Sequence, residues 1–249
     1  MSVSHEDRLA HERTHGTFLA TNPAKYWGHE SLAGRLRVER RIDLFRDKAH
    51  LEPGVRICEI GCGTGIFTKL LLERTGATIV GIDISPDLLA IAGRDVPDPR
   101  VSFVLGDCMQ PETLGIPLEF DAVVTNSVLH HLEVEKALLA VFRMLRPGGV
   151  FVCSEPNMMN PQIALQKNIP WIKKMVGDSP DETAFFRWKI TERMREVGFT
   201  DVFAKPFDFL HPGLPDVIAK PCDRALRLFE RIPLLREISG SLLIGGRKP

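Results

Sequence analysis

Short apolar runs alternate with amphipathic segments from residue 55 to residue 156. The apolar runs are rich in valine and isoleucine, which is typical of buried strands, and they span 55–61, 77–84, 101–107, 120–127 and 150–156. The intervening segments repeat apolar residues at helical spacing, at 66–76, 86–96 and 136–149. Ser85 before Pro86 predicts a helix start, and Gly76 predicts a helix end. This alternation indicates βαβ units, and therefore a parallel sheet with helices on both faces.

The pattern changes on either side of this region. Residues 1–50 carry two helical patterns, the clearer one within 34–51, and predict a helical cap. Residues 156–180 are rich in proline and show no strand alternation. Beyond them we expect helices near 183–198 and 215–232 and strands near 199–210 and 241–249.

Composition and charge restrict the function. The chain has 249 residues, 44% hydrophobic and 26% charged, which is ordinary for a soluble α/β protein. Basic and acidic residues number 32 each. This balance disfavours a nucleic-acid partner, because proteins that bind nucleic acids normally carry a surplus of basic residues to neutralise the phosphates. The five cysteines form no C-x-x-C pair and predict neither a disulfide framework nor a zinc site. The charged amino terminus and the lack of an apolar run near ~18 residues predict a soluble, cytoplasmic protein.

The loop after the first predicted strand reads Glu59-Ile60-Gly61-Cys62-Gly63-Thr64-Gly65. One interpretation is a tight strand-to-helix turn that binds no ligand. A dinucleotide fingerprint, G-x-G-x-x-G, requires a third glycine where the chain has Ile66. A P-loop requires a lysine in G-K-[ST] register, and none follows. The acid directly before the loop suits a ligand with an ammonium group and would repel a phosphate.

The pattern E-x-G-x-G-x-G resembles the first motif of the class I (Rossmann-like) S-adenosylmethionine-dependent methyltransferases, in their small-molecule "type 11"-like group. The resemblance covers residues 55–155 well, through six elements in the right order, and the rest in outline. It implies an α/β fold: a seven-stranded, mostly parallel, doubly wound sheet with helices on both faces and an antiparallel last strand. It also implies an N-terminal helical cap at 1–50 and a methyltransferase domain at 51–249, with substrate-side lid insertions at about 156–182 and 208–236.

The resemblance also implies which residues bind the cofactor. Asp83 matches the family acid that accepts hydrogen bonds from both ribose hydroxyls, although dinucleotide enzymes use the same device. Asp107 matches the position that recognises the adenine amine, with a helix cap as the alternative. The implied cofactor-binding set is Glu59, Gly61, Cys62, Gly63, Gly65, Asp83, Ile84, Asp107, Cys108, Asn126 and Ser127.

Candidate catalytic residues follow the fourth predicted strand. Methyl transfer requires alignment of the acceptor with the methyl–sulfur bond, and a base only where the acceptor must lose a proton. His130 and His131 lie at the carboxyl edge of the sheet, where open α/β sheets bind ligands. Relatives often have L-H-H-L or L-x-H-L here, so His131 is the first candidate for the base and His130 the second. A histidine bonded to backbone at a helix start is an equal alternative for His131.

Three segments are expected to contact the acceptor: the end of the fifth strand, an aromatic stretch of the cap and the apolar lid. An aromatic ring near the sulfonium would make a cation–π contact, and an aromatic anchor for the cap is the alternative. The residues expected to contact the substrate are Tyr26, Trp27, His29, Glu155, Asn157 and Trp171. The histidines show no recognisable ligand spacing, so no metal site is expected.

The sequence therefore predicts an S-adenosylmethionine-dependent methyltransferase, producing S-adenosylhomocysteine, that methylates a hydroxyl of a small organic acceptor in a biosynthetic pathway. The fourth motif, TNSV, departs from the N/D/S-P-P-Y/F/W of nucleic-acid amino-methyltransferases. Carbon or nitrogen acceptors on a lipid, quinone or sugar intermediate remain open. So do a nicotinamide-dependent oxidoreductase and a catalytically silent binding module of the same fold. We expect a monomer or homodimer without stable membrane insertion, with peripheral contact with a lipid-linked substrate left open.

Overall fold

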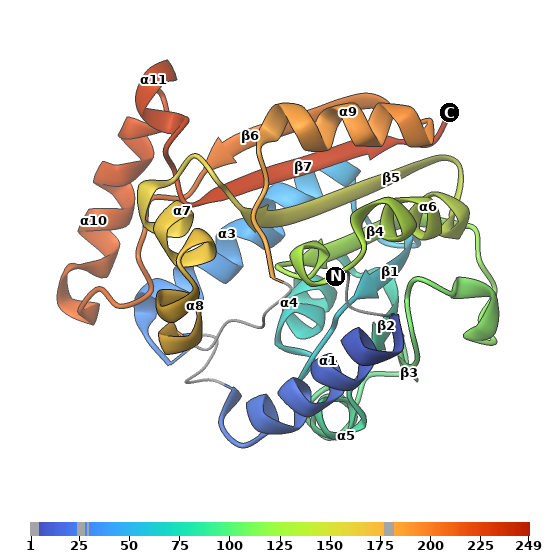
Figure 1. Cartoon of the computed structure of the whole chain (residues 1–249). Helices are drawn as coiled ribbons and strands as arrows, with labels where there is room; N and C mark the ends of the chain where they lie inside the picture. The colour runs from blue at the N-terminus through green and yellow to red at the C-terminus, as the bar shows by residue number, and fades with distance from the viewer. Residues whose placement is uncertain (1–4, 24–27, 29, 177–181) are drawn as a thin grey trace.

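The computed structural model describes residues 5–23, 28, 30–176 and 182–249 (Figure 1). Its strands are β1 Arg56–Ile60, β2 Thr78–Asp83, β3 Val101–Leu105, β4 Phe120–Asn126, β5 Leu145–Pro156, β6 Thr200–Phe207 and β7 Ser241–Arg247. Its α-helices are α1 His5–Ala20, α3 Leu32–Ala49, α4 Ile66–Thr75, α5 Pro86–Asp95, α6 Val134–Met144, α7 Pro161–Asn168, α8 Pro170–Val176, α9 Arg187–Val197, α10 Asp216–Phe229 and α11 Pro233–Arg236. Two short 3-10 helices, η1 Pro111–Thr113 and η2 Leu129–His131, complete the described elements.

The seven strands form one sheet in the order β3-β2-β1-β4-β5-β7-β6. All neighbouring pairs are parallel except those of β7, which runs antiparallel to both β5 and β6. The predicted α/β fold, with its mostly parallel sheet and antiparallel last strand, is confirmed.

Two apolar clusters pack on opposite faces of the sheet. On one face α6 and α9 contribute Leu138, Met144 and Met194, which pack with Phe151 of β5. On the other face α3 and α4 contribute residues such as Phe45 and Leu71. Figure 1 shows α6 and α9 in front of the sheet and α3 behind it. Burial on both faces explains why the parallel strands read as continuous apolar runs.

The order of the strands reverses between β1 and β4. The chain proceeds outward from β1 through β2 to β3 and then returns to the other side of β1 as β4. In open α/β sheets such a switch point leaves a crevice at the carboxyl ends of the strands, and ligands bind there. The glycine loop after β1, Asp83 at the end of β2 and the histidines after β4 all lie at this edge.

Two parts of the sequence-based prediction require correction. Residues 145–149 were expected to end a helix, but β5 begins at Leu145 because Pro147 and Gly148 cannot continue a helix: Pro147 has no N–H, and Gly148 has a φ of 77°. The proline-rich insertion, where no helix was predicted, contains α7 and α8. Asn160 caps α7 by accepting a hydrogen bond from the Ile163 N–H, ahead of Pro161.

The predicted N-terminal cap contains two helices with different surroundings. Helix α3 buries an apolar face against α4 and the sheet. Helix α1 has no apolar stripe and lies over α5. The boundary expected near residue 50, and the insertions expected at 156–182 and 208–236, stay predictions. None of the described helices is long and apolar enough to cross a bilayer.

Candidate functional site

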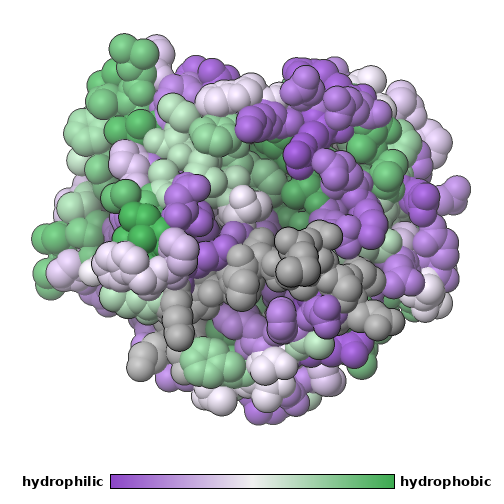
Figure 2. Space-filling model, viewed as in Figure 1, coloured by the Kyte–Doolittle hydropathy of each residue, from purple (hydrophilic) through white to green (hydrophobic). Residues whose placement is uncertain are grey.

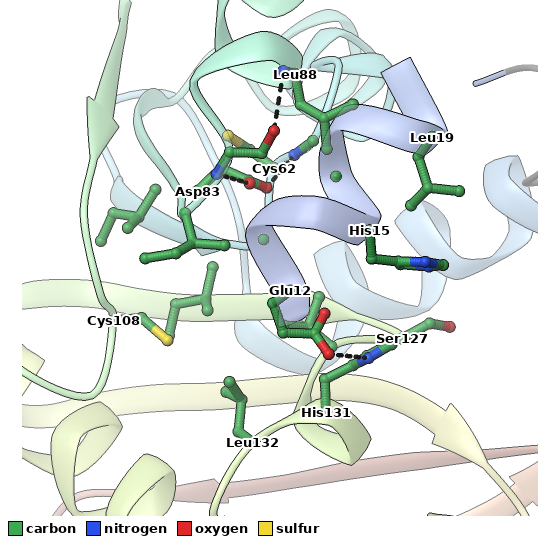
Figure 3. A pocket seen from close by; sticks show the side chains of 18 of the residues that line it. Glu12, His15, Leu19, Cys62, Asp83, Leu88, Cys108, Ser127, His131 and Leu132 are labelled. Carbon is green, nitrogen blue, oxygen red and sulfur yellow. Dashed lines mark hydrogen bonds and ion pairs between the residues drawn. The ribbon is translucent and has the colours of Figure 1, made fainter. Parts of the chain in front are cut away.

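A cavity of about 590 Å³ lies at the switch point of the sheet. Its wall includes the glycine loop, the ends of β2 and β4, the η2 turn and one side of α1. Figure 3 shows α1 crossing this cavity, with Glu12 on one side facing His131 and Asp83 on the opposite wall. A cavity of this size accommodates a ligand of cofactor dimensions.

The backbone of the glycine loop is held in a conformation that only glycine adopts easily. Gly61, Gly63 and Gly65 all have positive φ angles, of 69°, 53° and 77°. A Cβ atom on Gly61 would lie 2.4 Å from Cγ2 of Val128, so this glycine also allows the loop to pack against the turn after β4. The Gly63 N–H donates to Oδ2 of Asp83 at 2.8 Å and ties the loop to β2.

Asp83 is fixed by backbone donors on both carboxylate oxygens. Oδ1 accepts from the Ser85 N–H at 2.9 Å, and Oδ2 accepts from Gly63. Each carboxylate oxygen has two lone pairs, so both retain capacity for a further donor. Burial raises the pKa of Asp83 above its ordinary value, although these hydrogen bonds oppose the shift.

Glu59 lies at the other end of the loop and is 2% exposed. Its Oε2 accepts a hydrogen bond of 2.6 Å from the hydroxyl of Thr68 in α4. Burial raises the pKa of Glu59 to about 8, the Thr68 hydrogen bond opposes this shift, and Asp83 adds to it. Two buried carboxyls with raised pKa values in one cavity favour a ligand that brings positive charge.

The far wall of the cavity contains Ile84, Asp107 and Cys108. Both oxygens of Asp107 accept hydrogen bonds within its own loop, from the Met109 N–H at 2.9 Å and from the Gln110 side chain at 3.1 Å. The hydrogen bond from the Met109 N–H therefore supports the alternative, a capping role for Asp107. Recognition of adenine by Asp107 stays a prediction.

The end of β4 is joined to α3 by a buried arginine. Nη1 of Arg41 donates to Oδ1 of Asn126 at 3.2 Å, and Nη2 donates to Ser241 and Asp208. Ser127 follows with a φ of 58°, a left-handed conformation that is uncommon for serine, and its N–H donates to the Ser154 carbonyl. These contacts fix the turn that carries the two histidines.

His130 and Glu155 form a buried pair. Nδ1 of His130 lies 2.7 Å from Oε2 of Glu155, whose Oε1 accepts from the N–H groups of Val128 and Leu129. Since a carboxylate accepts hydrogen bonds, Nδ1 carries the proton and Nε2 is the acceptor in the neutral ring. Burial and the neighbouring His131 lower the pKa of His130, and the Glu155 hydrogen bond opposes them. This histidine is therefore neutral at pH 7.

His131 faces α1 instead. Its Nδ1 lies 3.3 Å from Oε1 of Glu12, and Arg8 donates from Nη1 to the His131 carbonyl at 2.9 Å. Burial alone would lower the pKa of His131, but the hydrogen bond and charge of Glu12 raise it above the ordinary value. The contact with Glu12 therefore joins α1 to the η2 turn, and it is an ion pair when His131 is protonated (Figure 3).

The two histidines and Glu182 lie close enough for their side-chain ligand atoms to fall within 4.8 Å of one another. This cluster was not foreseen from the sequence, where no metal site was expected. Lys167 already places Nζ 2.6 Å from Oε2 of Glu182, so an ammonium group balances that carboxylate. The absence of a metal site stays a prediction.

The residues expected to contact substrate are only partly brought together. Glu155 supports His130 from beneath the cavity, and Asn157 donates to the carbonyls of Glu237 and Ser239. Trp171 on α8 is 67% exposed and outside the cavity wall. Tyr26, Trp27 and His29 lie outside the described residues.

Several residues of the cavity wall were missed from the sequence: Arg8, Glu12, Arg41, Met175 and Glu182. They reach the site through tertiary contacts between segments far apart in the chain. The one local signal was α1 itself, since a helix without an apolar stripe requires partners beyond an apolar core.

Comparison with known proteins agrees with this geometry. Residues 58–153 match a family model described as a methyltransferase domain. The match covers most of the segment from β1 to β5. The family resemblance inferred from the glycine loop is thereby confirmed.

Relatives of this domain differ in what their names say they methylate. The chain is 27% identical over 168 residues to phosphoethanolamine N-methyltransferase 3 of Arabidopsis thaliana, covering 65% of this chain and 32% of that protein. It is 31% identical over 155 residues to the mitochondrial ubiquinone biosynthesis O-methyltransferase of Rattus norvegicus, covering 57% of this chain and 44% of that protein. The matches thus span about a third to under a half of these relatives.

A solved structure shows the same fold over most of the chain. The N-methyltransferase NodS from Bradyrhizobium japonicum, in complex with S-adenosyl-L-homocysteine, is similar with a TM-score of 0.64 and 17% identity. That similarity covers 96% of this chain and 98% of NodS. The methyltransferase fold therefore includes elements on both sides of residues 58–153.

Proposed function

We propose that the chain transfers a methyl group from S-adenosylmethionine to a hydroxyl group of a small organic acceptor. The observation that carries this proposal is one cavity of about 590 Å³ that contains the glycine loop, the doubly anchored Asp83 and a neutral histidine backed by Glu155. The methyltransferase domain family and its O-methyltransferase relatives support it.

The cofactor would lie between the glycine loop and the end of β2. Asp83, with lone pairs left on both oxygens, would accept from the two ribose hydroxyls. Glu59 would face the positively charged amino group of the cofactor across the loop, and Ile84 and Cys108 would flank the adenine. When bound, the cofactor supplies an electrophilic methyl group on a sulfonium.

His130 is the better placed of the two histidines to accept the proton of the acceptor hydroxyl. Its Nε2 is an acceptor in the neutral ring, and Glu155 fixes the orientation of the ring through Nδ1. His131, whose Nδ1 lies 3.3 Å from Oε1 of Glu12, would hold α1 over the cavity and exclude water. This reverses the sequence-based preference for His131 as the base.

Binding and turnover together test the proposal. Calorimetry should show binding of S-adenosylhomocysteine and none of NADH, because the glycine loop lacks the dinucleotide fingerprint, with Ile66 at the position of the third glycine. Incubation with methyl-labelled S-adenosylmethionine and a panel of phenols, sugars, amines and acyl thioesters then identifies the acceptor atom.

Each outcome distinguishes this function from one of its alternatives. Tight binding of NADH without S-adenosylhomocysteine would overturn the proposal in favour of an oxidoreductase. Cofactor binding without transfer to any acceptor would favour a silent binding module. Labelled amine with no labelled hydroxyl would move the function to N-methylation, the activity in the names of the plant relatives.

A further inference from the structure

Helix α10 presents three distinct faces. Successive helical residues advance by ~100°, so positions along α10 can be assigned to arcs around its axis. One arc is turned toward α3 and includes Ala219, Asp223, Leu226 and Glu230. The remaining circumference is exposed and divides into an apolar stripe and a basic stripe.

The apolar stripe is continuous along the whole helix. Its residues lie within an arc of roughly 120° and recur every three or four positions. They are Val217, Ile218, Pro221, Ala225, Leu228 and Phe229. Val217 is 87% exposed, and α11 continues the surface with Leu234 at 86%. Figure 2 shows this surface as hydrophobic at the left and upper left, where α10 and α11 lie in Figure 1.

The basic stripe runs beside the apolar one. Lys220, Arg224 and Arg227 fall within a second arc of roughly 60°, and Arg231 follows just after the end of the helix. Two acids of this segment bond elsewhere, since Asp216 accepts from the Leu32 N–H and Glu230 bonds to Arg40. A third, Asp223, accepts a hydrogen bond of 2.9 Å from Nε of Arg227 within the stripe. The exposed side of α10 therefore combines apolar side chains with positive charge.

We propose that α10 and α11 dock on the surface of an anionic lipid bilayer. A helix with an exposed apolar face flanked by lysine and arginine lies in the plane of such a surface, with its apolar side chains among the lipids and its cations near the headgroups. A second copy of the chain is a poorer occupant, because a two-fold contact would bring the two basic stripes together.

The apolar surface continues toward the cavity. Nδ2 of Asn160, the residue that caps α7, donates to the carbonyl of Ile238 just after α11. Helix α8 then follows α7, and its Met175 is 70% exposed and also lines the cavity wall. An acceptor with a hydrocarbon portion would therefore have an apolar route from the bilayer to the site. This last step rests on the proposed function, whereas the docking itself does not.

Vesicle sedimentation with matched variants tests the docking. The wild-type chain should co-sediment with vesicles containing phosphatidylserine, weakly with pure phosphatidylcholine, and less as salt is raised. The double substitutions Leu228→Gln with Leu234→Gln, and Arg224→Gln with Arg231→Gln, should each reduce the bound fraction by about ten-fold or more. Leu105→Gln, at an exposed leucine of the edge strand β3, is the control and should bind as wild type.

Absence of sedimentation with phosphatidylserine vesicles, or equal binding by all variants, overturns the proposal. Light scattering could instead show a dimer that becomes a monomer when both leucines are substituted. That result, without vesicle binding, would assign the surface to contact with a second copy of the chain. Binding of S-adenosylhomocysteine should be unchanged in all of these variants. A chain that binds vesicles but no S-adenosylhomocysteine would refute the proposed function and leave the docking intact.

Discussion

At the scale of single residues, the site depends on buried groups whose protonation differs from that in water. Glu59 and Asp83 have pKa values raised by burial, His130 has a lowered one and His131 a raised one. Such opposed shifts within one cavity are typical of functional sites, because burial and neighbouring charges select one protonation state for each group.

His130→Gln tests the assignment of the base. The substitution removes the acceptor Nε2 but keeps a polar side chain beside Glu155, so we expect turnover to fall by about 100-fold with unchanged affinity for S-adenosylhomocysteine. In the wild-type chain, turnover should decrease as the pH falls through the lowered pKa of His130, because protonation occupies Nε2. His131→Gln is the matched comparison and should affect turnover less. Equal losses in both variants would contradict the assignment.

From the raised pKa of Glu59 we predict that cofactor binding releases a proton. With a folded-state pKa of about 8 it is mostly protonated at pH 7 in the free chain, and a nearby ammonium group favours its ionised form. Its contribution to stability is present below the unfolded pKa of about 4.3 and is lost as the pH rises through about 8.

Calorimetry in two buffers with different ionisation enthalpies measures this release. At pH 7, binding of S-adenosylhomocysteine should release a substantial fraction of one proton, and Glu59→Gln should reduce that release. Glu52→Gln, at an exposed position before the same strand, is the control. Identical binding enthalpies in both buffers for the wild-type chain would show that Glu59 does not respond to the ligand.

At the scale of elements, short-range sequence patterns predicted the helices and strands whose boundaries depend on neighbouring residues. The strands and helices from β1 to β4 follow from apolar periodicity, the Ser85 cap and Gly76. The start of β5 was predicted incorrectly because β5 follows α6 directly, with no turn residues between them. Helix α7 was not predicted, although Asn160-Pro161 is a helix-start signal.

The same contrast applies to the site. The glycine loop, Asp83 and the histidine pair were identified because each belongs to one short segment. Glu12 and Arg41 were not, because each contributes through a contact with a residue more than 80 positions away: His131 for Glu12 and Asn126 for Arg41. No periodicity in the sequence encodes such pairings.

Helix α1 is expected to act as a cover over the cavity. It has no apolar stripe and is held by specific contacts, including Thr17 to Asp87 at 2.7 Å and Glu12 to His131. Gly16 lies directly against α5, where an added Cβ would be 2.6 Å from Cβ of Ser85. Gly16→Leu should therefore displace α1 and weaken S-adenosylhomocysteine binding about ten-fold or more, with little change in the unfolding free energy of the sheet.

Hydrogen exchange of α1 measures this directly. In the wild-type chain S-adenosylhomocysteine should slow exchange in α1, and in Gly16→Leu exchange should be fast with or without ligand. Thr14→Leu, at an exposed position of the same helix, should behave as wild type. Wild-type affinity in Gly16→Leu would show that α1 is not needed to retain the ligand.

At the scale of the whole molecule, one buried network joins the first and last parts of the chain to the site. Arg41 of α3 contacts Asn126 at the end of β4, Asp208 after β6 and Ser241 at the start of β7. Arg37 adds a hydrogen bond of 2.8 Å to Asp208. Because the network joins α3 to the ends of β4 and β6 and to the start of β7, loss of one charge should affect global stability and the position of the β4 turn together.

Asp208 predicts how the stability of the whole fold depends on pH. Burial alone would raise its pKa, but Arg37 and Arg41 hold it below the ordinary value. A carboxyl whose pKa is lower in the folded chain stabilises the fold fully above its unfolded pKa of about 3.9, and this contribution is lost as the pH falls through the folded value. Urea unfolding should therefore show stability declining below about pH 4.

Asp208→Asn should lower the unfolding free energy at pH 7 by about 3 kcal/mol, because it leaves Arg41 buried with only neutral partners and Arg37 without its carboxylate. It should also flatten the acid limb of the stability profile, since the titrating group is gone. Asp201→Asn, at an exposed carboxyl of β6, should keep both the stability and the limb of the wild-type chain. An unchanged acid limb in Asp208→Asn would mean that other carboxyls, and not this network, set the acid stability of the fold.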